Sequence, residues 1–331
     1  MKLLMNFAYT PTSEQEARLR EIWPGLELRL ENLAPERLDG ADVEVLVSEL
    51  VPRDLAAWPK LRWVQLPSAG SNQILGHPIQ ATDIAVTTAS GTHAVPIAQY
   101  VTCTCLMMAH RMEQLLQFKP SRTWPNRPAL AGRPLRGQTA GIIGYGSIGR
   151  ECARQLAALG LRIVCLKHDP ANRRATGYNA WPETGDPEGR IPSQWYGPGQ
   201  LPELLAESDW VVVTVPSTPR TQGLIDTAQF SAFKPGARLI IISRGGIVSE
   251  PALAAALRDG RLAAAAVDCY VREPLPPDDP LFDVPNLLMT PHMSGVYDGF
   301  WPRFMDLVGE NLRRYRAGLP LLNATRRHLG Y

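Results

Sequence analysis

Short apolar runs alternate with helical or proline-containing stretches over residues 1–97. Ser13 and Glu16 form a capping box that predicts a helix through Ile22. Five apolar runs predict strands, at residues 3–9, 26–30, 43–47, 61–66 and 84–88. Because strands that alternate with helices usually lie parallel, this half of the chain is expected to form a small, flavodoxin-like parallel sheet.

The alternation is more regular between residues 139 and 268. Strands are predicted at residues 139–143, 162–166, 211–215, 239–243 and 264–268. Helices are predicted between and after them, at residues 147–159, 201–206, 227–233 and 250–259. This order is typical of a Rossmann-type doubly wound sheet, which has helices on both faces.

Two further helices and two irregular segments complete the pattern. Helix 93–112 is apolar on most faces, as a buried connector or an oligomer interface would be, and helix 298–317 stops before Gly318. Residues 118–136 predict a surface loop, and residues 167–200 a long loop of a kind that is often functional. We therefore expect two α/β domains, residues 1–97 with 297–331 and residues 98–296.

A glycine-rich turn joins the strand 139–143 to the helix that follows it. Gly144 permits the tight turn, Gly146 lets backbone N–H groups approach a phosphate, and Gly149 lets the helix pack closely on the strand. Such a spacing alone can be an empty structural turn, but the flanking strand, helix and second strand favour a dinucleotide. The predicted cofactor-binding residues of this turn are Gly144, Tyr145, Gly146, Ser147, Ile148 and Gly149.

Polar segments follow three strands of the predicted doubly wound sheet. They contain Ser243 with Arg244, Asp268 with Glu273, and His292 after Thr290. Ligands of open α/β sheets collect at the carboxyl ends of the strands, so these side chains are candidates for chemistry. The loop at residues 67–72 also follows a strand, and it is either an anion-binding turn or an ordinary connection.

Composition narrows the possible partners. The chain has 331 residues, 45% of them hydrophobic, which suits two domains, and its net charge of +2 argues against nucleic acid or a membrane as the main partner. No run approaches the length of a membrane span. The five cysteines lie in apolar runs, which predicts reduced, buried thiols in a cytoplasmic protein without a metal site.

Four segments in order, GIIGYGSIG, ISRGGIVSEPAL, AAVDCYVREPLP and LLMTPHMSG, resemble the signatures of the D-isomer-specific 2-hydroxyacid dehydrogenases. The resemblance implies an enzyme that transfers a hydride between NAD(P) and a small 2-keto or 2-hydroxy acid. It implies that Arg244 binds the substrate carboxylate, that His292 is the general acid/base, and that Glu273 is the partner of His292. Imidazole chemistry and the fork geometry of arginine suit these roles.

The same resemblance implies further contacts in both domains. Ser243 and Asp268 would lie beside the cofactor, Asp268 near its nicotinamide, and Val215 with Pro216 would lie along its adenine and ribose. Ala69, Gly70 and Ser71 would form the substrate loop of the smaller domain, together with Arg244 and His292 from the larger one. Trp124 matches a family tryptophan, although a packing role suits it equally.

The sequence departs from the family where the cofactor ribose would bind. Lys167 stands in place of the usual acid, with His168, Arg173 and Arg174 close behind, and these cations could hold the 2′-phosphate of NADP. Asp169 could instead reach the ribose of NAD if the strand ended later. The sequence thus favours NADP(H) over NAD(H). A second departure is Ala98-Gln99, where the family commonly has Ala-Glu.

We interpret the chain as a cytoplasmic 2-hydroxyacid dehydrogenase of the glyoxylate or hydroxypyruvate reductase kind, and expect a homodimer. One alternative is a cofactor-sensing binding protein on the same scaffold. Another is a family dehydrogenase for formate, phosphite or a phosphorylated hydroxy acid.

Overall fold

The computed structural model describes residues 1–325 and forms two compact units. The first unit comprises Met1–His93, Gly177–Pro182 and Tyr297–Tyr331, and the second Ala94–Thr176 and Glu183–Val296. Residues 326–331, which the predicted division gave to the first domain, lie outside the described residues. The units differ from that division in two places: the first ends at His93, and it gains six residues of the long loop.

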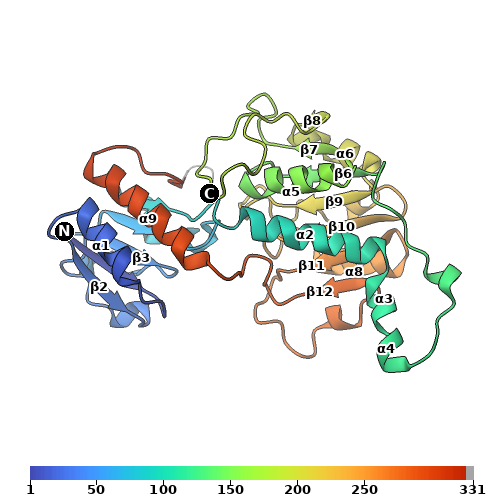
Figure 1. Cartoon of the computed structure of the whole chain (residues 1–331), viewed down its shortest axis with the longest axis horizontal. Coiled ribbons are helices and arrows are strands. Elements are labelled where there is room, and N and C mark those ends of the chain that lie inside the picture. Colours follow the sequence, from blue (N-terminus) through green and yellow to red (C-terminus); the bar gives the residue numbers. More distant parts are fainter. Residues whose placement is uncertain (326–331) are drawn as a thin grey trace. The chain divides into compact units, whose positions relative to one another are not determined.

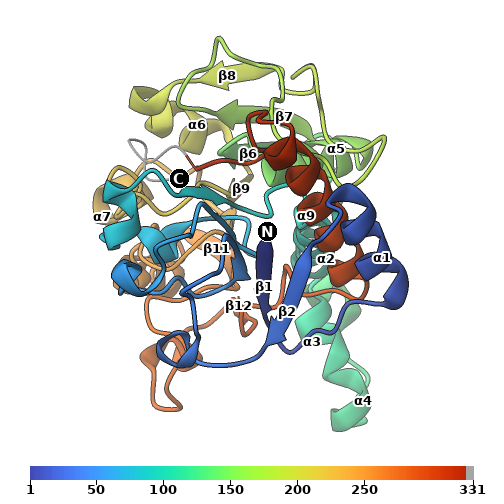
Figure 2. The same cartoon turned by 90° about the vertical axis from the view of Figure 1, so that its left-hand side faces the viewer.

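The first unit contains a five-stranded parallel sheet in the order β2-β1-β3-β4-β5. Its strands are β1 (Lys2–Asn6), β2 (Glu27–Glu31), β3 (Val45–Ser48), β4 (Trp63–Gln65) and β5 (Ala85–Thr87). Helices α1 (Ser13–Ile22) and α9 (Phe300–Arg316) pack against each other beside it (Figure 2). The predicted flavodoxin-like sheet is present, with each strand slightly shorter than or shifted from the apolar run that predicted it.

Alternate residues of the strands supply two cores on the two faces of this sheet. Leu3 and Val45 point to the face that buries Phe304 and Leu307 of α9. Leu4 and Leu46 point to the other face, which buries Trp58 and Ile79. A parallel sheet covered on both faces needs this continuous apolar pattern, and the burial of β3 at every position reflects it.

The first helix begins with a capping box one residue earlier than the sequence suggested. Thr12, in extended conformation, accepts a hydrogen bond from the Gln15 backbone N–H at 3.2 Å, and Gln15 Oε1 accepts one from the Thr12 N–H at 2.8 Å. The prediction of Ser13 and Glu16 as the box was therefore wrong. Threonine and glutamine form the motif as well as serine and glutamate do.

The second unit contains a seven-stranded parallel sheet in the order β12-β11-β10-β9-β6-β7-β8 (Figure 1). Its strands are β6 (Thr139–Ile143), β7 (Arg162–Leu166), β8 (Gln194–Tyr196), β9 (Trp210–Val213), β10 (Ala237–Ile241), β11 (Leu262–Val267) and β12 (Leu287–Met289). The chain reverses direction across the sheet between β6 and β9. In doubly wound folds, ligands bind at such a switch point.

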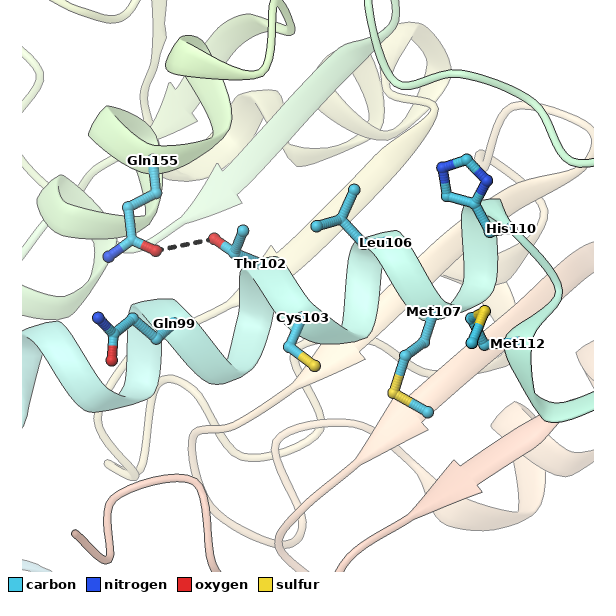
Figure 3. A pocket seen from close by; sticks show the side chains of 8 residues that line it. All are labelled: Gln99, Thr102, Cys103, Leu106, Met107, His110, Met112 and Gln155. Carbon is cyan, nitrogen blue, oxygen red and sulfur yellow. Dashed lines mark hydrogen bonds between the residues drawn. The ribbon is translucent and has the colours of Figure 1, made fainter. Parts of the chain in front are cut away.

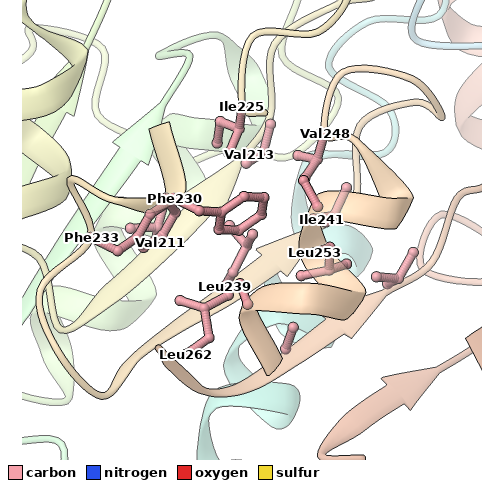
Figure 4. Close-up of a cluster of buried hydrophobic side chains, with 14 of the residues drawn as sticks. Val211, Val213, Ile225, Phe230, Phe233, Leu239, Ile241, Val248, Leu253 and Leu262 are labelled. Atoms are coloured by element: carbon pink, nitrogen blue, oxygen red, sulfur yellow. The ribbon is translucent and has the colours of Figure 1, made fainter. Parts of the chain in front are cut away.

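Helices cover both faces of the seven-stranded sheet. They are α2 (Ala94–Ala109), α5 (Ser147–Ala158), α6 (Leu201–Glu207), α7 (Thr227–Phe230) and α8 (Glu250–Arg258). Helices α2 and α5 pack together over one core. The core on the other face joins Val211, Leu239 and Phe230 to Leu253 of α8 (Figure 4).

The predicted helix 93–112 is interrupted. Helix α2 ends at Ala109, Arg111 has a positive φ of 53°, and a short helix α3 (Met112–Leu116) follows. The predicted loop 118–136 contains another short helix, α4 (Phe118–Ser121). Both short helices project from the sheet (Figures 1 and 2).

The long loop 167–200 is anchored to α5 by buried polar side chains. Arg150 donates to the Arg173 carbonyl at 2.7 Å and to the Asp186 carbonyl, while Glu151 accepts from the Gly185 N–H at 2.7 Å. Asp186 accepts hydrogen bonds from the backbone N–H groups of Arg190 and Ile191. Strand β8, which the sequence did not predict, ends this loop. These hydrogen bonds give the loop a defined path without an apolar repeat.

Candidate active site

Three strand ends of the second unit bring the polar segments together. Strands β10, β11 and β12 are neighbours and parallel, so their carboxyl ends share one edge of the sheet. Arg244 follows β10, Glu273 follows β11 and His292 follows β12. The predicted catalytic residues therefore come from three successive positions along this edge.

His292 and Glu273 are in direct contact. The Nδ1 atom of His292 lies 2.9 Å from Oε2 of Glu273, and each side chain keeps about two-fifths of its surface exposed, 40% and 38%. The other oxygen, Oε1, accepts the Tyr270 backbone N–H at 2.8 Å. Because a carboxylate at Nδ1 accepts a hydrogen bond from that nitrogen, it fixes the ring orientation and leaves Nε2 for substrate.

The backbone around His292 is held by Asp268. Asp268 is 1% exposed, and its carboxylate accepts the N–H groups of Met293 and Ser294, both at 2.8 Å, and the Thr290 hydroxyl at 2.5 Å. These hydrogen bonds fix the backbone on both sides of His292. The φ of His292 is 55°, in the left-handed region that histidine adopts more readily than most residues. The sequence assigned Asp268 to the nicotinamide, and here its oxygens bind the histidine segment.

Tyr100 of α2 completes this network, and sequence reasoning missed it. Its hydroxyl lies 2.6 Å from Oγ1 of Thr290. Burial raises the pKa of Tyr100, which keeps the phenol protonated as a hydrogen-bonding group. The signal available in the sequence was a tyrosine within an otherwise apolar helix, but only the fold brings it to a residue 190 positions away.

Arg244 begins at the end of β10, and its guanidinium folds back toward its own backbone. Its NH1 atom donates to the Ser243 carbonyl at 2.8 Å. Arg244 lies near Cys269, whose pKa burial raises to about 12, so that thiol is not a nucleophile at neutral pH. The Oγ of Ser243 is buried and has no hydrogen-bond partner among the described residues. A buried hydroxyl without a partner marks a position that a ligand can satisfy.

The glycine turn between β6 and α5 has the geometry of a phosphate site. Gly144 has a φ of 99°, and a Cβ on Gly149 would lie 2.2 Å from the Gly144 carbonyl oxygen. A Cβ on Gly146 would meet no atom within 4 Å, so the backbone there is open to a ligand. The N-terminal N–H groups of α5, a 12-residue helix, follow at once. This cradle fits a dinucleotide pyrophosphate.

Several other residues predicted around the cofactor pack or form hydrogen bonds within the second unit. Tyr145 is 3% exposed and donates to Asp186 at 2.8 Å, so its side chain belongs to the core and only its backbone can serve the turn. Ile148 packs at the edge of the same core. Val215 packs against the opposite core, and the carbonyl of Pro216 accepts the Thr221 hydroxyl at 2.6 Å.

Lys167 follows β7 directly, at the position where a ribose-binding acid usually stands. Its Nζ donates to the Asn172 carbonyl, and burial together with nearby Arg150 lowers its pKa. Asp169 instead holds the turn, because its Oδ1 accepts the N–H groups of Ala171 at 3.2 Å and Asn172 at 3.4 Å. The guanidinium carbon of Arg173 lies 5.3 Å from the ring centroid of Trp195. Arg174 forms an ion pair with Glu188, with 2.9 Å between NH2 and Oε1.

The predicted substrate loop, Ala69, Gly70 and Ser71, follows β4 in the first unit. The Ser68 hydroxyl donates to the Gly70 carbonyl at 2.7 Å and shapes the turn. Ser71 is 2% exposed, and its Oγ has no hydrogen-bond partner among residues 1–325. This second unsatisfied hydroxyl also lies at a position assigned to a ligand.

The described residues contain no disulfide, no candidate metal-binding cluster and no candidate membrane-spanning helix. All five cysteines are free, and four are buried; the prediction that all are buried was wrong for Cys103, which is exposed on α2. Within the described part of the chain, no cluster of three His, Cys, Asp or Glu side chains could hold a metal ion. Nor does that part contain a helix long and apolar enough to cross a membrane.

Comparison with known proteins relates the chain to enzymes of known activity. Residues 102–294 match the family model described as D-isomer specific 2-hydroxyacid dehydrogenase, NAD binding domain. The chain is 34% identical over 279 residues to an (S)-sulfolactate dehydrogenase of Chromohalobacter salexigens, covering 83% of this chain and 85% of that protein. It is 30% identical over 288 residues to a glyoxylate reductase of Korarchaeum cryptofilum, covering 86% and 82%.

A solved structure is similar over the whole chain. The D-isomer specific 2-hydroxyacid dehydrogenase of Xanthobacter autotrophicus Py2, in complex with NADPH and MES, has a TM-score of 0.81 and 27% identity. The match covers 100% of this chain and 99% of that one. The similarity therefore includes residues of both compact units.

Proposed function

From the premise that the chain belongs to the D-isomer specific 2-hydroxyacid dehydrogenase family, we propose that Arg244, Glu273 and His292 reduce a small 2-keto acid. Members of this family are NAD(P)-dependent oxidoreductases of 2-hydroxy and 2-keto acids. The observation that supports these roles most directly is the 2.9 Å contact between His292 and Glu273, at the ends of the two strands that follow the strand of Arg244 in the sheet.

Reduction of a 2-keto acid adds a hydride to the keto carbon and a proton to its oxygen. When bound, the reduced nicotinamide supplies a hydride to the keto carbon. Nε2 of protonated His292 gives its proton to the carbonyl oxygen, which becomes the hydroxyl of the product. Glu273 stabilises the charged imidazole and holds its orientation. Arg244 binds the substrate carboxylate with two parallel N–H donors and keeps the carbonyl beside the histidine.

The residues that would hold the cofactor are those of the glycine turn and the strand ends beside it. The pyrophosphate would bind the backbone at Gly146 and the start of α5, and Ser243 would offer its unsatisfied hydroxyl to the cofactor. Asp268 supports this site indirectly, by shaping the loop that carries His292.

Steady-state assay of a panel of 2-keto acids with NADH and with NADPH tests this function. Glyoxylate, hydroxypyruvate and pyruvate form the first set, and formate and phosphite, assayed for oxidation, form the second. Reduction of a keto acid supports the proposal. Binding of cofactor without turnover of any member of the panel would instead favour a cofactor-sensing protein.

Lys167 supports a preference for NADP(H). Partial burial and the nearby charge of Arg150 destabilise the charged ammonium group of Lys167. The negative charge of the 2′-phosphate of NADP would offset this destabilisation. Arg173 adds positive charge nearby, whereas Glu188 already neutralises Arg174. The related Xanthobacter enzyme was crystallised with NADPH. The turn held by Asp169 also leaves this carboxylate less suited to the ribose of NAD.

Replacing Lys167 by aspartate should therefore lower the ratio of kcat/KM for NADPH to that for NADH by at least ~10-fold, because an attraction becomes a repulsion. Lys60→Asp makes the same charge change at an exposed position of the first unit, and it should leave the ratio unchanged. If the wild type prefers NADH by tenfold or more, Lys167 does not select the cofactor and Asp169 becomes the candidate.

A second copy of this chain is the occupant we assign to the exposed face of α2. Cys103, Leu106 and Met107 line an open hollow of about 580 Å³ there, together with Met112 (Figure 3). Helix α3 and the loop after α4 add exposed apolar side chains, Leu116 at 58% and Trp124 at 73%. Exposed apolar side chains gathered on adjoining segments are typical of an interface. The free cysteines agree with a cytoplasmic location.

The dimer should dissociate when Met107 is replaced by glutamate, because a buried charge opposes its own symmetry-related copy. Light scattering after gel filtration should then give the mass of a single chain instead of twice that mass. Leu50→Glu, at an exposed leucine of the first unit, should remain dimeric. A monomeric wild type would contradict the assignment.

A further inference from the structure

The long loop contributes an indole to the first unit. Residues Gly177–Pro182 belong to that unit although both flanking segments belong to the second. Nε1 of Trp181 donates to the Thr92 carbonyl at 2.8 Å, and the Tyr297 hydroxyl donates to the same oxygen at 3.1 Å. Two rings from distant parts of the sequence are thus fixed at one point of the backbone.

Arg303, in the first turn of α9, lies against that indole. Its guanidinium carbon is 3.6 Å from the Trp181 ring centroid, and its NH1 donates to the Gly299 carbonyl at 3.1 Å. An arginine held by a ring and a carbonyl loses little further freedom when it binds a ligand, and a guanidinium has five N–H donors, so others remain for that ligand.

No carboxylate neutralises Arg303 within the described residues, whereas three other arginines on or near α9 are paired with one. Arg313 and Arg314 both lie within 4 Å of Glu310, and Arg18 pairs with Asp306. A half-buried, oriented cation without an acidic partner is a position where an oxyanion gains a charge-assisted hydrogen bond.

A continuous set of aromatic contacts joins Arg303 to the substrate loop. Nε2 of His93 lies 3.0 Å from the carbonyl oxygen of Pro67, which stands two residues before that loop. The His93 ring stacks on the ring of Phe300, with 5.0 Å between the centroids, and forms a T-shaped contact with Tyr297 at 6.3 Å between the centroids. Phe300 lies one helical turn before Arg303. The loop and the arginine are therefore two ends of one cluster in the first unit.

We propose that Arg303, held by Trp181, binds a second anionic group of the substrate. This inference rests on the proposed function. The substrates would be 2-keto or 2-hydroxy acids that carry a carboxylate, sulfonate or phosphate at the end opposite the reacting carboxylate. Arg303 would then determine specificity, and Trp181 would position it.

The kinetic test compares keto acids with one and with two anionic groups. Arg303→Met keeps the apolar stem and removes the charge, so the ratio of kcat/KM for oxaloacetate, 3-sulfopyruvate or 3-phosphohydroxypyruvate to that for glyoxylate should fall ~10- to 100-fold. The substrate with the largest fall identifies the second anion. Arg303→Lys should give an intermediate ratio, and Arg313→Met, on the exposed side of the same helix, should give the wild-type ratio.

A binding measurement without turnover separates this inference from the proposed function. Sodium sulfate, titrated against sodium chloride of equal ionic strength, should change the part of the tryptophan fluorescence that Trp181→Phe removes, and Arg303→Met should abolish the change. Where the wild type reduces keto acids, an unchanged selectivity ratio in Arg303→Met overturns the inference. Where it reduces none, the proposed function fails, and the lack of an Arg303-dependent sulfate response overturns the inference as well.

Discussion

Replacing His292 by asparagine should lower kcat for keto-acid reduction by at least ~10²-fold, because the hydride acceptor then has no proton donor beside its oxygen. Asparagine is the better substitution at this position. The His292 backbone has a φ of 55°, which asparagine tolerates more readily than alanine, so the variant removes the imidazole with little backbone strain.

Cofactor affinity is the control for this variant. The dissociation constant of NADPH, measured by fluorescence, should change by less than about threefold, since a loss confined to the chemical step leaves cofactor binding intact. Glu273→Gln should give a smaller fall in kcat, because an amide can still accept from Nδ1 but does not stabilise a charged ring. Near-normal turnover of His292→Asn would show that another group supplies the proton.

Much of the fold could be predicted because its strands are buried on both faces. Strands β6 and β7 coincide with the apolar runs that predicted them, at residues 139–143 and 162–166. Their central residues have no exposed face, so the sequence is apolar throughout and flanking glycines mark the ends. The two parallel sheets and the doubly wound order were confirmed for the same reason.

The long loop could not be predicted, because polar contacts with distant residues determine its path. Arg150, Glu151 and Asp186 are buried and bind backbone groups, and a hydropathy pattern contains no record of which carbonyl an arginine reaches. Strand β8 has only three residues and pairs with β7 at the edge of the sheet. No sequence pattern near Trp181 indicated that this residue belongs to the first unit.

Within the candidate site, the sequence predicted strand ends better than it predicted the use of each side chain. The positions of Arg244, Glu273 and His292 follow from parallel strands that end at one edge. The contacts of Asp268 with Thr290, Met293 and Ser294 depend on how two loops fold over each other. A motif gives the residue type at a position but not which of its neighbours that residue binds.

Replacing Arg244 by lysine should lower kcat/KM for 2-keto acids by ~10²-fold or more, although the charge is kept. The guanidinium can offer two parallel N–H donors to a carboxylate, while an ammonium is a point charge with no fixed plane. The loss should appear in both KM and kcat, because a carboxylate that is less well oriented also leaves the carbonyl misplaced relative to His292.

The matched control is Arg258→Lys at the exposed end of α8 in the same unit, which should keep wild-type kinetics. A second variant, Arg244→Ala, distinguishes geometry from charge: added guanidinium chloride should restore part of its activity at concentrations where methylammonium chloride restores less, because only the first ion reproduces the fork. If Arg244→Lys is as active as the wild type, the carboxylate is bound elsewhere. The Ser71 loop of the first unit, with its unsatisfied hydroxyl, then becomes the position to test.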